Sequence, residues 1–280
     1  MLGKKLDLSN PSGLNAKIMW LKFNTYRDNP LISKCSDKYA VREYVTDCGC
    51  PEILNELYGV WERAEDIDWE TLPNAFVLKC NHGCGYNWLC PDKRTADRQD
   101  ALTRLKQWMS EDYWLEFAEL QYRDIPKRII CEKYLGESLT DYKFYCFNGK
   151  PLYVLVCIGR TDGQPSHVPG LENPKFYFFD RNWNMQPLTN DSLHCSEGVN
   201  IPRPENLDQM WKYAEKLCGP FPFVRTDLYD TKGKIVFGEL TFTPAAALDN
   251  GRLPETDRLF GELLRLDSCP AESNGKLRRS

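Results

Sequence analysis

Long apolar segments are absent from this chain of 280 residues. No run reaches the roughly 18 apolar residues of a membrane-spanning helix. The first ten residues, MLGKKLDLSN, also lack the apolar centre of a secretory signal. These absences argue against a membrane-embedded or exported protein, and we therefore expect a cytoplasmic one.

An excess of positive charge is lacking as well. The chain has 36 lysines and arginines against 40 aspartates and glutamates, a net charge of −4, and its isoelectric point is near 5.6. Because polyanions attract proteins through clustered cations, we do not expect nonspecific binding to nucleic acid. A local basic groove that holds phosphates is compatible with this balance.

The twelve cysteines lack the spacing of a disulfide framework. Three of them lie in apolar runs, where a free thiol packs as a small hydrophobic group: Cys131, Cys146 and Cys157. We predict that most cysteines are reduced core residues. Cys80, Cys84 and Cys90, with His82, are metal-ligand types, but their spacing does not match a zinc knuckle or ribbon.

Periodic patterns are what the chain does have, and its 42% hydrophobic content suffices to bury a large core. Helices are predicted at residues 15–24, 36–49, 206–217 and 255–266, with Ser36 and Asn206 as caps. A longer amphipathic helix begins near Thr95, and its apolar face consists of Leu102, Leu105, Trp108 and Met109. Strands are predicted at residues 75–81, 128–135, 142–147, 152–158 and 175–180. Asn148 and Gly149 predict a hairpin turn between two of these strands.

Residues 221–244, FPFVRTDLYDTKGKIVFGELTFTP, predict a second β-hairpin with charged side chains inside its strands. A period of two places Arg225 and Asp227 on one face of the first strand. The same alternation places Glu239 and Thr241 on one face of the second strand.

A turn at residues 230–233 brings Asp227 opposite residue 237 or 238, which leaves Glu239 diagonal to Asp227 and within reach. Two carboxylates so placed repel each other unless a cation or a proton lies between them. Their hard oxygen ligands suit a magnesium ion that carries nucleotide phosphates. The alternative is a surface hairpin with solvated charges.

Six short sequence motifs occur in order between about residue 15 and residue 266: DKYAVREYV, FVLKCNHG, EKYL, DYKFYCFNGK, FPFVRTDLY and FGELTF. Together they resemble the TupA-like ATP-grasp proteins, a family named for teichuronopeptide biosynthesis. The resemblance implies an α+β fold of the ATP-grasp type, in which antiparallel sheets with flanking helices form two lobes around a nucleotide.

We expect four segments within this fold. A small N-terminal lobe spans residues 1–73, the small ATP-grasp lobe spans residues 74–134, and the C-terminal lobe spans residues 135–267. The polar tail 268–280 has a composition that cannot build a core, so we predict that it is disordered.

The resemblance assigns the phosphates to the small lobe. Lys79 ends an apolar strand and is implied to contact phosphates as a point charge. Residues 81–85 are implied to form the loop over the phosphates, since glycines let backbone N–H groups approach oxygens closely. The loop residues assigned to the nucleotide are Asn81, His82, Gly83 and Gly85. Without the resemblance, a lysine in this position is usually a solvated strand end.

Residues 132–135 are implied to form the hinge between the lobes and to bind adenine. Glu132 would accept a hydrogen bond from the exocyclic amine and Leu135 would pack on the ring, with Lys133 and Tyr134 between them. The alternative is a plain edge strand.

The C-terminal lobe is implied to hold the transferred group. Lys143 is a second phosphate cation, and Asp141, on the same strand face, lies beside the nucleotide or serves only as its ion-pair partner. Arg225 and Lys79 are the implied catalytic cations, because a planar guanidinium suits the oxygens of a phosphoryl group or an acyl phosphate. The implied magnesium ligands are Asp227, Glu239 and Thr241. Many ATP-grasp enzymes carry asparagine at the position of Thr241, and a hydroxyl is a weaker metal ligand.

The resemblance predicts an ATP-dependent carboxylate–amine ligase that uses ATP and Mg²⁺ and passes through an acyl phosphate. The association of the family with surface polysaccharides implies that a uronic acid or another small-molecule or glycan carboxylate is coupled to an amino acid or other amine. One alternative is a kinase that phosphorylates a sugar or another hydroxyl acceptor. A second alternative is a non-enzymatic nucleotide-binding module. The oligomeric state is not predicted.

Overall fold

Two antiparallel sheets form the framework of the computed structural model, which describes residues 6–136, 139–158, 174–193, 200–231 and 233–266. Within these residues, the small sheet has the order β1-β4-β2-β3: Leu57–Trp61, Ile129–Lys133, Phe76–Cys80 and Asn87–Cys90. The large sheet has the order β10-β9-β5-β6-β7-β8: Lys234–Thr241, Phe223–Thr231, Thr140–Phe147, Lys150–Ile158, Lys175–Phe179 and Met185–Gln186. The predicted α+β class with antiparallel sheets is confirmed.

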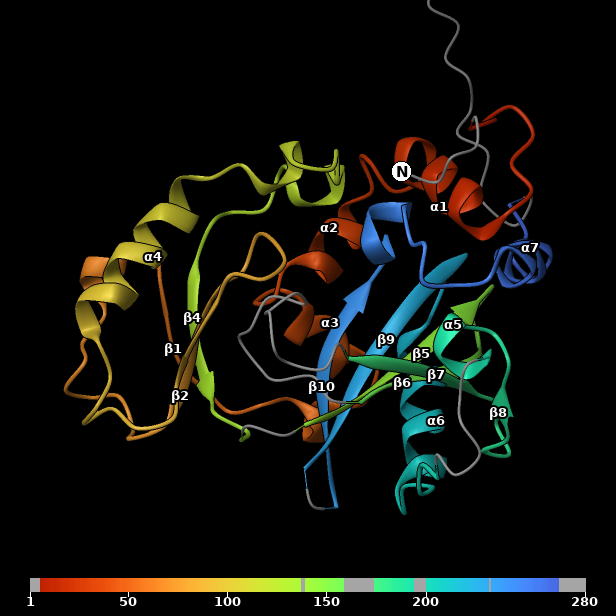
Figure 1. The fold of residues 1–280 in the computed structure, drawn as a ribbon. Coiled ribbons are helices and arrows are strands. Elements are labelled where there is room, and N and C mark those ends of the chain that lie inside the picture. The colour runs from red at the N-terminus through yellow and green to blue at the C-terminus, as the bar shows by residue number, and fades with distance from the viewer. Residues whose placement is uncertain (1–5, 137–138, 159–173, 194–199, 232, 267–280) are drawn as a thin grey trace, which may run out of the picture.

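Helices surround both sheets (Figure 1). The α-helices are α1 (Leu14–Asn24), α2 (Pro30–Ser36), α3 (Val41–Asp47), α4 (Arg98–Ser110), α5 (Asn190–Leu193), α6 (Leu207–Leu217) and α7 (Pro254–Leu263). Short 3-10 helices are η1 (Pro51–Ile53), η2 (Ala64–Asp66), η3 (Tyr113–Leu115), η4 (Leu120–Tyr122) and η5 (Pro244–Ala247). Across the described ranges, none of the helices combines the length and the apolar character that crossing a membrane requires.

The small sheet is covered on one face by α4. Asp97 caps this helix and accepts hydrogen bonds from the amides of Gln99 and Asp100 at 2.9 and 3.0 Å. The predicted apolar face of α4 packs against the sheet through Leu102, Leu105, Trp108 and Met109. Alternation along β2 sends Phe76, Leu78 and Cys80 into the same core. Lys79 therefore lies on the opposite face, which is turned toward the large sheet (Figure 1).

The large sheet is covered on both faces. On one face, the ring of Trp211 from α6 lies 4.9 Å from the ring of Phe144. On the other face, the ring of Phe260 from α7 lies 5.9 Å from the ring of Tyr145. Because side chains alternate along β5, Lys143 shares the face of Tyr145.

The N-terminal helices belong to the core of the large sheet. Leu14, Ile18 and Val45 are fully buried in the same apolar cluster as Phe144 and Phe260. The predicted lobe boundaries at residues 73, 134 and 267 stay a prediction.

The chain crosses between the two sheets twice, at neighbouring places. It enters the small sheet after η1 and returns to the large sheet after β4. The side-chain amide of Asn55 donates to the carbonyl of Lys133 at 2.9 Å, and the amide of Lys133 donates to the carbonyl of Glu56 at 2.9 Å. The two crossings therefore run side by side.

Local predictions succeeded where the signal lay within a few residues. Asn148 and Gly149 both have positive φ, +50° and +75°, and join β5 to β6 as the predicted hairpin turn. The helix predicted at residues 206–217 is α6, although the side chain of Asn206 makes no capping hydrogen bond.

The predicted helix cap at Ser36 is wrong. Ser36 is the last residue of α2, and its hydroxyl donates to the carbonyl of Ile32 at 2.8 Å. The helix α2 escaped prediction although Asn29 caps it and Pro30 is its first residue. The predicted disordered tail, residues 268–280, lies outside the described residues.

Candidate functional site

The hairpin of β9 and β10 carries its charges on the face of the large sheet that also bears Lys143. Asp227 is directly opposite Glu239, and Arg225 is directly opposite Thr241. The predicted diagonal placement of Glu239 is wrong, because a β-bulge at Gly238 adds one residue to β10. A Cβ atom at residue 238 would lie 3.0 Å from the carbonyl oxygen of Asp227, so glycine permits this close approach.

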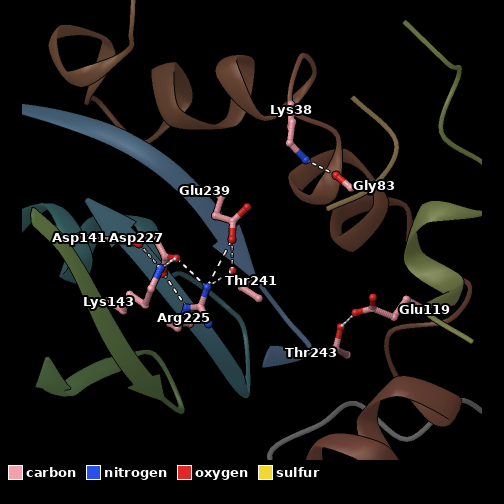
Figure 2. Close-up of polar contacts among 10 residues, drawn as sticks. All are labelled: Lys38, Gly83, Glu119, Asp141, Lys143, Arg225, Asp227, Glu239, Thr241 and Thr243. Carbon is pink, nitrogen blue, oxygen red and sulfur yellow. Dashed lines mark hydrogen bonds and ion pairs between the residues drawn. The ribbon is translucent and has the colours of Figure 1, made fainter. Parts of the chain in front are cut away.

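Arg225 lies at the centre of this face (Figure 2). Its Nε and Nη2 atoms donate to the two oxygens of Asp227 at 2.7 and 2.6 Å, a bidentate contact. The Nη2 atom also lies 3.0 Å from the hydroxyl of Thr241 and 3.3 Å from Oε1 of Glu239. The hydroxyl of Thr241 donates to that same oxygen at 2.8 Å. The guanidinium thus occupies the place between two carboxylates where the sequence predicts a cation.

The strand β5 extends the row of charges. Lys143 is in register with Asp227, and its Nζ atom donates to Oδ2 of Asp227 at 2.7 Å. Lys143 also forms the ion pair with Asp141 that the sequence suggests. Burial acts against the charge of Lys143, but the neighbouring carboxylates outweigh it and raise the pKa of this lysine. We call Asp141, Lys143, Asp227, Arg225 and Glu239 the charge row.

Glu239 is the accessible end of the charge row. Its side chain is 39% exposed, against 2% for Asp227. Burial by the surrounding protein disfavours the ionised form of Glu239. The positive charges of Arg225, Lys38 and Lys143 outweigh this effect and lower the pKa of Glu239 to about 2. The carboxylate is therefore ionised at neutral pH and open to a ligand.

Lys38 is a functional candidate that the sequence analysis missed. It lies in the turn between α2 and α3. Its Nζ atom donates to the carbonyl of Gly83 in residues 81–85, which we call the glycine loop (Figure 2). Its charge also contributes to the low pKa of Glu239. The phrase DKYAVREYV contains this lysine, but no local pattern distinguishes it from a solvated one.

Lys79 is held by an ion pair on the small sheet. Its Nζ atom lies 2.7 Å from Oε2 of Glu132, and Nη1 of Arg42 lies 3.2 Å from the other oxygen. The side chain of Lys79 keeps 27% of its surface exposed, against 10% for Glu132. Both oxygens of Glu132 are thus bound by protein cations, whereas the sequence expected one to receive the adenine amine. Arg42, on α3, is a second cation that the sequence analysis missed.

The first two residues of the glycine loop point into the protein. The side-chain amide of Asn81 donates to Asp37 at 2.8 Å and to the carbonyl of Pro126 at 2.9 Å. The Nε2 atom of His82 lies 3.1 Å from the carbonyl of Trp108, and burial lowers the pKa of His82. Both side chains are engaged within the protein instead of facing outward from the loop.

The rest of the loop contains two glycines at positions that disfavour a side chain. Gly83 packs so closely on the ring of Tyr113 that a Cβ atom would lie 2.6 Å from a ring carbon. Gly85 has φ of +79°, the left-handed region that favours glycine. Cys84 reaches the surface, yet the surrounding protein and then the charge of Glu239 raise the pKa of its thiol. The negative charge of Glu239 thus acts on the thiol of Cys84 at the tip of this loop.

The predicted hinge residues connect the two sheets. Lys133 ends β4, and its Nζ atom lies 3.5 Å from a carboxylate oxygen of Glu56. Tyr134 and Leu135 follow and are half-buried. All three lie after the small sheet on the way to the large one, and their role beside adenine stays a prediction.

The donor atoms decide how magnesium fits this face. No group of three or more His, Cys, Asp or Glu side chains is placed to hold a metal within the described residues. Both oxygens of Asp227 are bound by Arg225, and one also by Lys143. Glu239 has one oxygen beyond its contacts with Arg225 and Thr241. Because Mg²⁺ often uses one or two carboxylates with phosphates and waters, Glu239 fits as it stands, and Asp227 fits once Arg225 turns away.

Comparison with known proteins settles the family. The sequence model of the family described as TupA-like ATPgrasp matches residues 16–265. The chain belongs to the TupA-like ATP-grasp family. The fold family predicted from the sequence motifs is thereby confirmed. No curated protein matches the chain.

Solved structures similar to this TupA-like protein include three proteins of low identity. D-alanine–D-alanine ligase from Bacillus anthracis is 14% identical over 82% of this chain and 64% of its own, with a TM-score of 0.49. N5-carboxyaminoimidazole synthetase from Staphylococcus aureus, complexed with ADP, is 13% identical over 75% and 45%, with a TM-score of 0.46. The ATP-grasp ligase PsnB, complexed with minimal precursor, Mg and ADP, is 14% identical over 81% and 57%, with a TM-score of 0.40. The chain thus spans 45–64% of the lengths of these proteins.

The structure of this TupA-like protein groups the predicted residues into two clusters. The charge row and Thr241 form one cluster on the large sheet. Lys79 and Glu132 form the other on the small sheet, joined by Arg42. Lys38 and Gly83 lie where the turn before α3 meets the glycine loop.

Proposed function

We propose that this TupA-like ATP-grasp protein is an ATP-dependent ligase that joins a carboxylate to an amine through an acyl phosphate. The observation that carries the proposal is the charge row, in which Lys143 and Arg225 pair with Asp227 and the carboxylate of Glu239 is exposed. Such a surface offers cations for phosphate oxygens and a carboxylate for their counter-ion. Membership of an ATP-grasp family supports ATP as the nucleotide.

The small sheet supplies the proposed phosphate contacts. Lys79 lies on the face turned toward the large sheet, and Glu132 holds its ammonium in place at 2.7 Å. Lys38 can exchange the carbonyl of Gly83 for a phosphate oxygen, because both are hydrogen-bond acceptors. The loop backbone adds N–H donors, and residues 132–135 flank the adenine. Within this proposal, Glu132 orients Lys79 and no longer receives the adenine amine.

The large sheet supplies the proposed contacts to the transferred group. Arg225 releases Asp227, Glu239 and Thr241 and turns its guanidinium edge to the phosphoryl oxygens, a geometry to which its planar fork is suited. Lys143 remains with Asp227 and keeps that carboxylate ionised. Glu239, with support from Asp227 and Thr241, would hold Mg²⁺, which would supply positive charge against the phosphate oxygens.

The reaction has two balanced steps. A substrate carboxylate oxygen attacks the terminal phosphorus, the bond to the bridging oxygen breaks, and ADP leaves. The amine nitrogen then attacks the acyl carbon, phosphate leaves with the bonding electron pair and the former carboxylate oxygen, and the nitrogen loses a proton. We further propose a uronic acid or another sugar carboxylate as the acid, a role in surface polysaccharide synthesis, and a cytoplasmic location where ATP is available.

The test follows a labelled oxygen. Uronic acids carrying heavy oxygen in the carboxylate are incubated with ATP, magnesium and a panel of amines, and the released phosphate is analysed by mass. A ligase transfers one labelled oxygen to phosphate only when the amine is present for full turnover. A stable phosphorylated product without free phosphate or amide would identify a kinase and remove the ligase proposal.

A further inference from the structure

A buried carboxylate that the proposed reaction does not yet use lies beyond the end of β10. Glu119 is in the connection between η3 and η4, and it is only 6% exposed. Its Oε1 atom accepts a hydrogen bond from the hydroxyl of Thr243 (Figure 2). The side-chain amide of Gln121 donates to the same oxygen at 3.5 Å and to the hydroxyl of Thr243 at 2.8 Å. These contacts fix the carboxylate in place.

Thr243 places this carboxylate near the charge row. Thr241 ends β10 and contacts both Arg225, at 3.0 Å, and Glu239, at 2.8 Å. Thr243 follows two residues later, and two residues span at most about 7 Å. Figure 2 shows Glu119 at Thr243, past the end of β10. Glu119 therefore lies a short distance beyond the site proposed for the phosphoryl group.

One oxygen of Glu119 remains open. The hydrogen bonds from Thr243 and Gln121 both reach Oε1, and among the described residues no donor reaches Oε2. Oε2 is also not one of the fully buried polar atoms that lack a partner in the described part of the chain, so it keeps accessible surface. The carboxylate thus has one oxygen held by the protein and one that can accept from a substrate.

The two segments that meet at Glu119 and Thr243 both have unusual backbone geometry. Ala118 has φ of +52°, and the three alanines at positions 245–247 also have positive φ. These are four of the six non-glycine residues with positive φ among those described. Lys22 joins the segments by donating to the carbonyls of Phe117 and Ala246. Strained backbone is concentrated at functional sites, so this contact is a candidate for one.

The environment of Glu119 suits a proton acceptor. Burial raises its pKa, the hydrogen bond from Thr243 and the charge of Lys22 oppose this effect, and the charge of Glu239 adds to it. A carboxylate with a raised pKa is a better base for neutral pH than an ordinary one. The titratable groups that face Glu119 come from five segments: Lys22 (α1), Cys84 (glycine loop), Tyr113 (η3), Tyr122 (η4) and Glu239 (β10).

We propose that Glu119 is the general base that takes a proton from the attacking amine. An ammonium group must lose one proton before its nitrogen has the electron pair that attacks the acyl carbon. Oε2 of Glu119 takes this proton. The C–N bond then forms, phosphate leaves with the electron pair of the C–O bond, and the nitrogen passes one further proton to that phosphate. Glu119 finally returns its proton to water.

This inference rests on the proposed ligase function, because it assigns one step of that reaction. The test compares two nucleophiles with the uronic acid that gives labelled phosphate with the wild type. One nucleophile is the aliphatic amine of the panel that the wild type couples fastest. The other is hydroxylamine, which is largely uncharged at neutral pH and therefore needs no base before it attacks. Its product, a hydroxamate, reports formation of the acyl phosphate.

Glu119→Gln should form the amide about 100-fold more slowly than the wild type at neutral pH. The same variant should form the hydroxamate at nearly the wild-type rate. The difference in amide synthesis should close as the pH rises toward the pKa of the amine, because solution then supplies the uncharged nucleophile. Glu116→Gln removes an exposed carboxylate from the same connection and is the matched control.

The outcomes separate this inference from the proposed function. Equal loss of amide and hydroxamate at every pH would make Glu119 a structural residue, and unchanged amide synthesis would exclude it from the reaction. Glu119→Asp keeps a shorter carboxylate and decides the question if Glu119→Gln does not fold, since its amide synthesis must fall further than its hydroxamate synthesis. A wild type that forms neither product contradicts the ligase function itself, and the role of Glu119 fails with it.

Discussion

Arg225 explains how Asp227 and Glu239 remain directly opposite each other. The charge row contains three carboxylates and two cations, and Arg225 touches two of those carboxylates. Removing one partner of a buried ion pair typically costs about 3–5 kcal/mol, because the other charge is left unpaired. Substitutions at Asp227 or Lys143 therefore mix folding with function, whereas Glu239 and Lys79 are exposed enough to separate the two.

Replacing Lys79 by alanine should weaken ATP binding about tenfold or more, the cost of one charge-assisted hydrogen bond. The fold should persist, since Glu132 keeps Arg42 as a partner. Calorimetry with ATP and magnesium measures the affinity. The matched control is Lys106→Ala on α4, which removes an exposed lysine that forms an ion pair with Glu65. Equal affinities of the two variants would exclude Lys79 from the nucleotide site.

Replacing Glu239 by glutamine should make stability depend differently on pH. The pKa of Glu239 is lowered from 4.5 to about 2 in the folded protein, so its ionised form stabilises the fold above pH 4.5 and loses this effect as pH falls toward 2. The melting temperature of the wild type should exceed that of Glu239→Gln at neutral pH, and the gap should close in that acidic range. A gap that stays constant down to pH 2 would contradict the assigned cause.

At the level of secondary structure, the sequence predicts strands well and their pairing less well. Alternation is a local property, so the positions of β5, β6, β9 and β10 follow from it. The register of Glu239 depends on one extra residue at Gly238, and a bulge changes the pairing without changing the alternation read from a single strand. The short helix α2 was missed because seven residues give too little periodicity.

The element η5 offers a separate test of strain. Three successive alanines, Ala245, Ala246 and Ala247, have φ of +47°, +53° and +68°, and left-handed geometry costs alanine roughly 1–2 kcal/mol per residue. Ala245 is exposed, so Ala245→Gly removes strain without removing buried contacts. Glycine also gains freedom in the unfolded chain, which leaves an expected stabilisation of about 0.5 kcal/mol. Urea unfolding measures the change in the free energy of unfolding. A clear destabilisation would contradict the inference that Ala245 is strained.

At the level of the whole molecule, the site is assembled from distant segments. The charge row was predictable because its residues lie in two hairpins with strong local patterns. Lys38 and Arg42 reach the site from a helical segment some 185 residues before Arg225, and no periodicity marks them. Asn81 and His82 turn inward because Asp37, Pro126 and Trp108 offer them partners, which only the folded chain brings near.

Because the glycine loop is close to the charge row, we expect bound ATP to protect Cys84 in that loop from alkylation. Cys84 reaches the surface at the tip of that loop, so it should be the thiol that alkylates first among the described cysteines. Its raised pKa should make the reaction slow at neutral pH and faster as pH rises. ATP with magnesium should slow the labelling of Cys84 further, as peptide mass analysis can show. An alkylation rate of Cys84 that ATP with magnesium leaves unchanged would place the loop away from the phosphates.

The paired crossings between the sheets have a consequence for synthesis on the ribosome. Residues 57–133 contain the whole small sheet and α4, and the described members of the apolar cluster of that sheet lie within residues 58–131. We therefore expect this part to fold before the rest of the chain has been made. The helices α1–α3 are made earlier, yet their apolar partners include Phe223 and Phe260, so they must wait for nearly the entire chain. In a nascent chain stalled before residue 223, α1–α3 would therefore remain exposed although the small sheet had already folded. We expect chaperones to bind such a chain at its N-terminal helices.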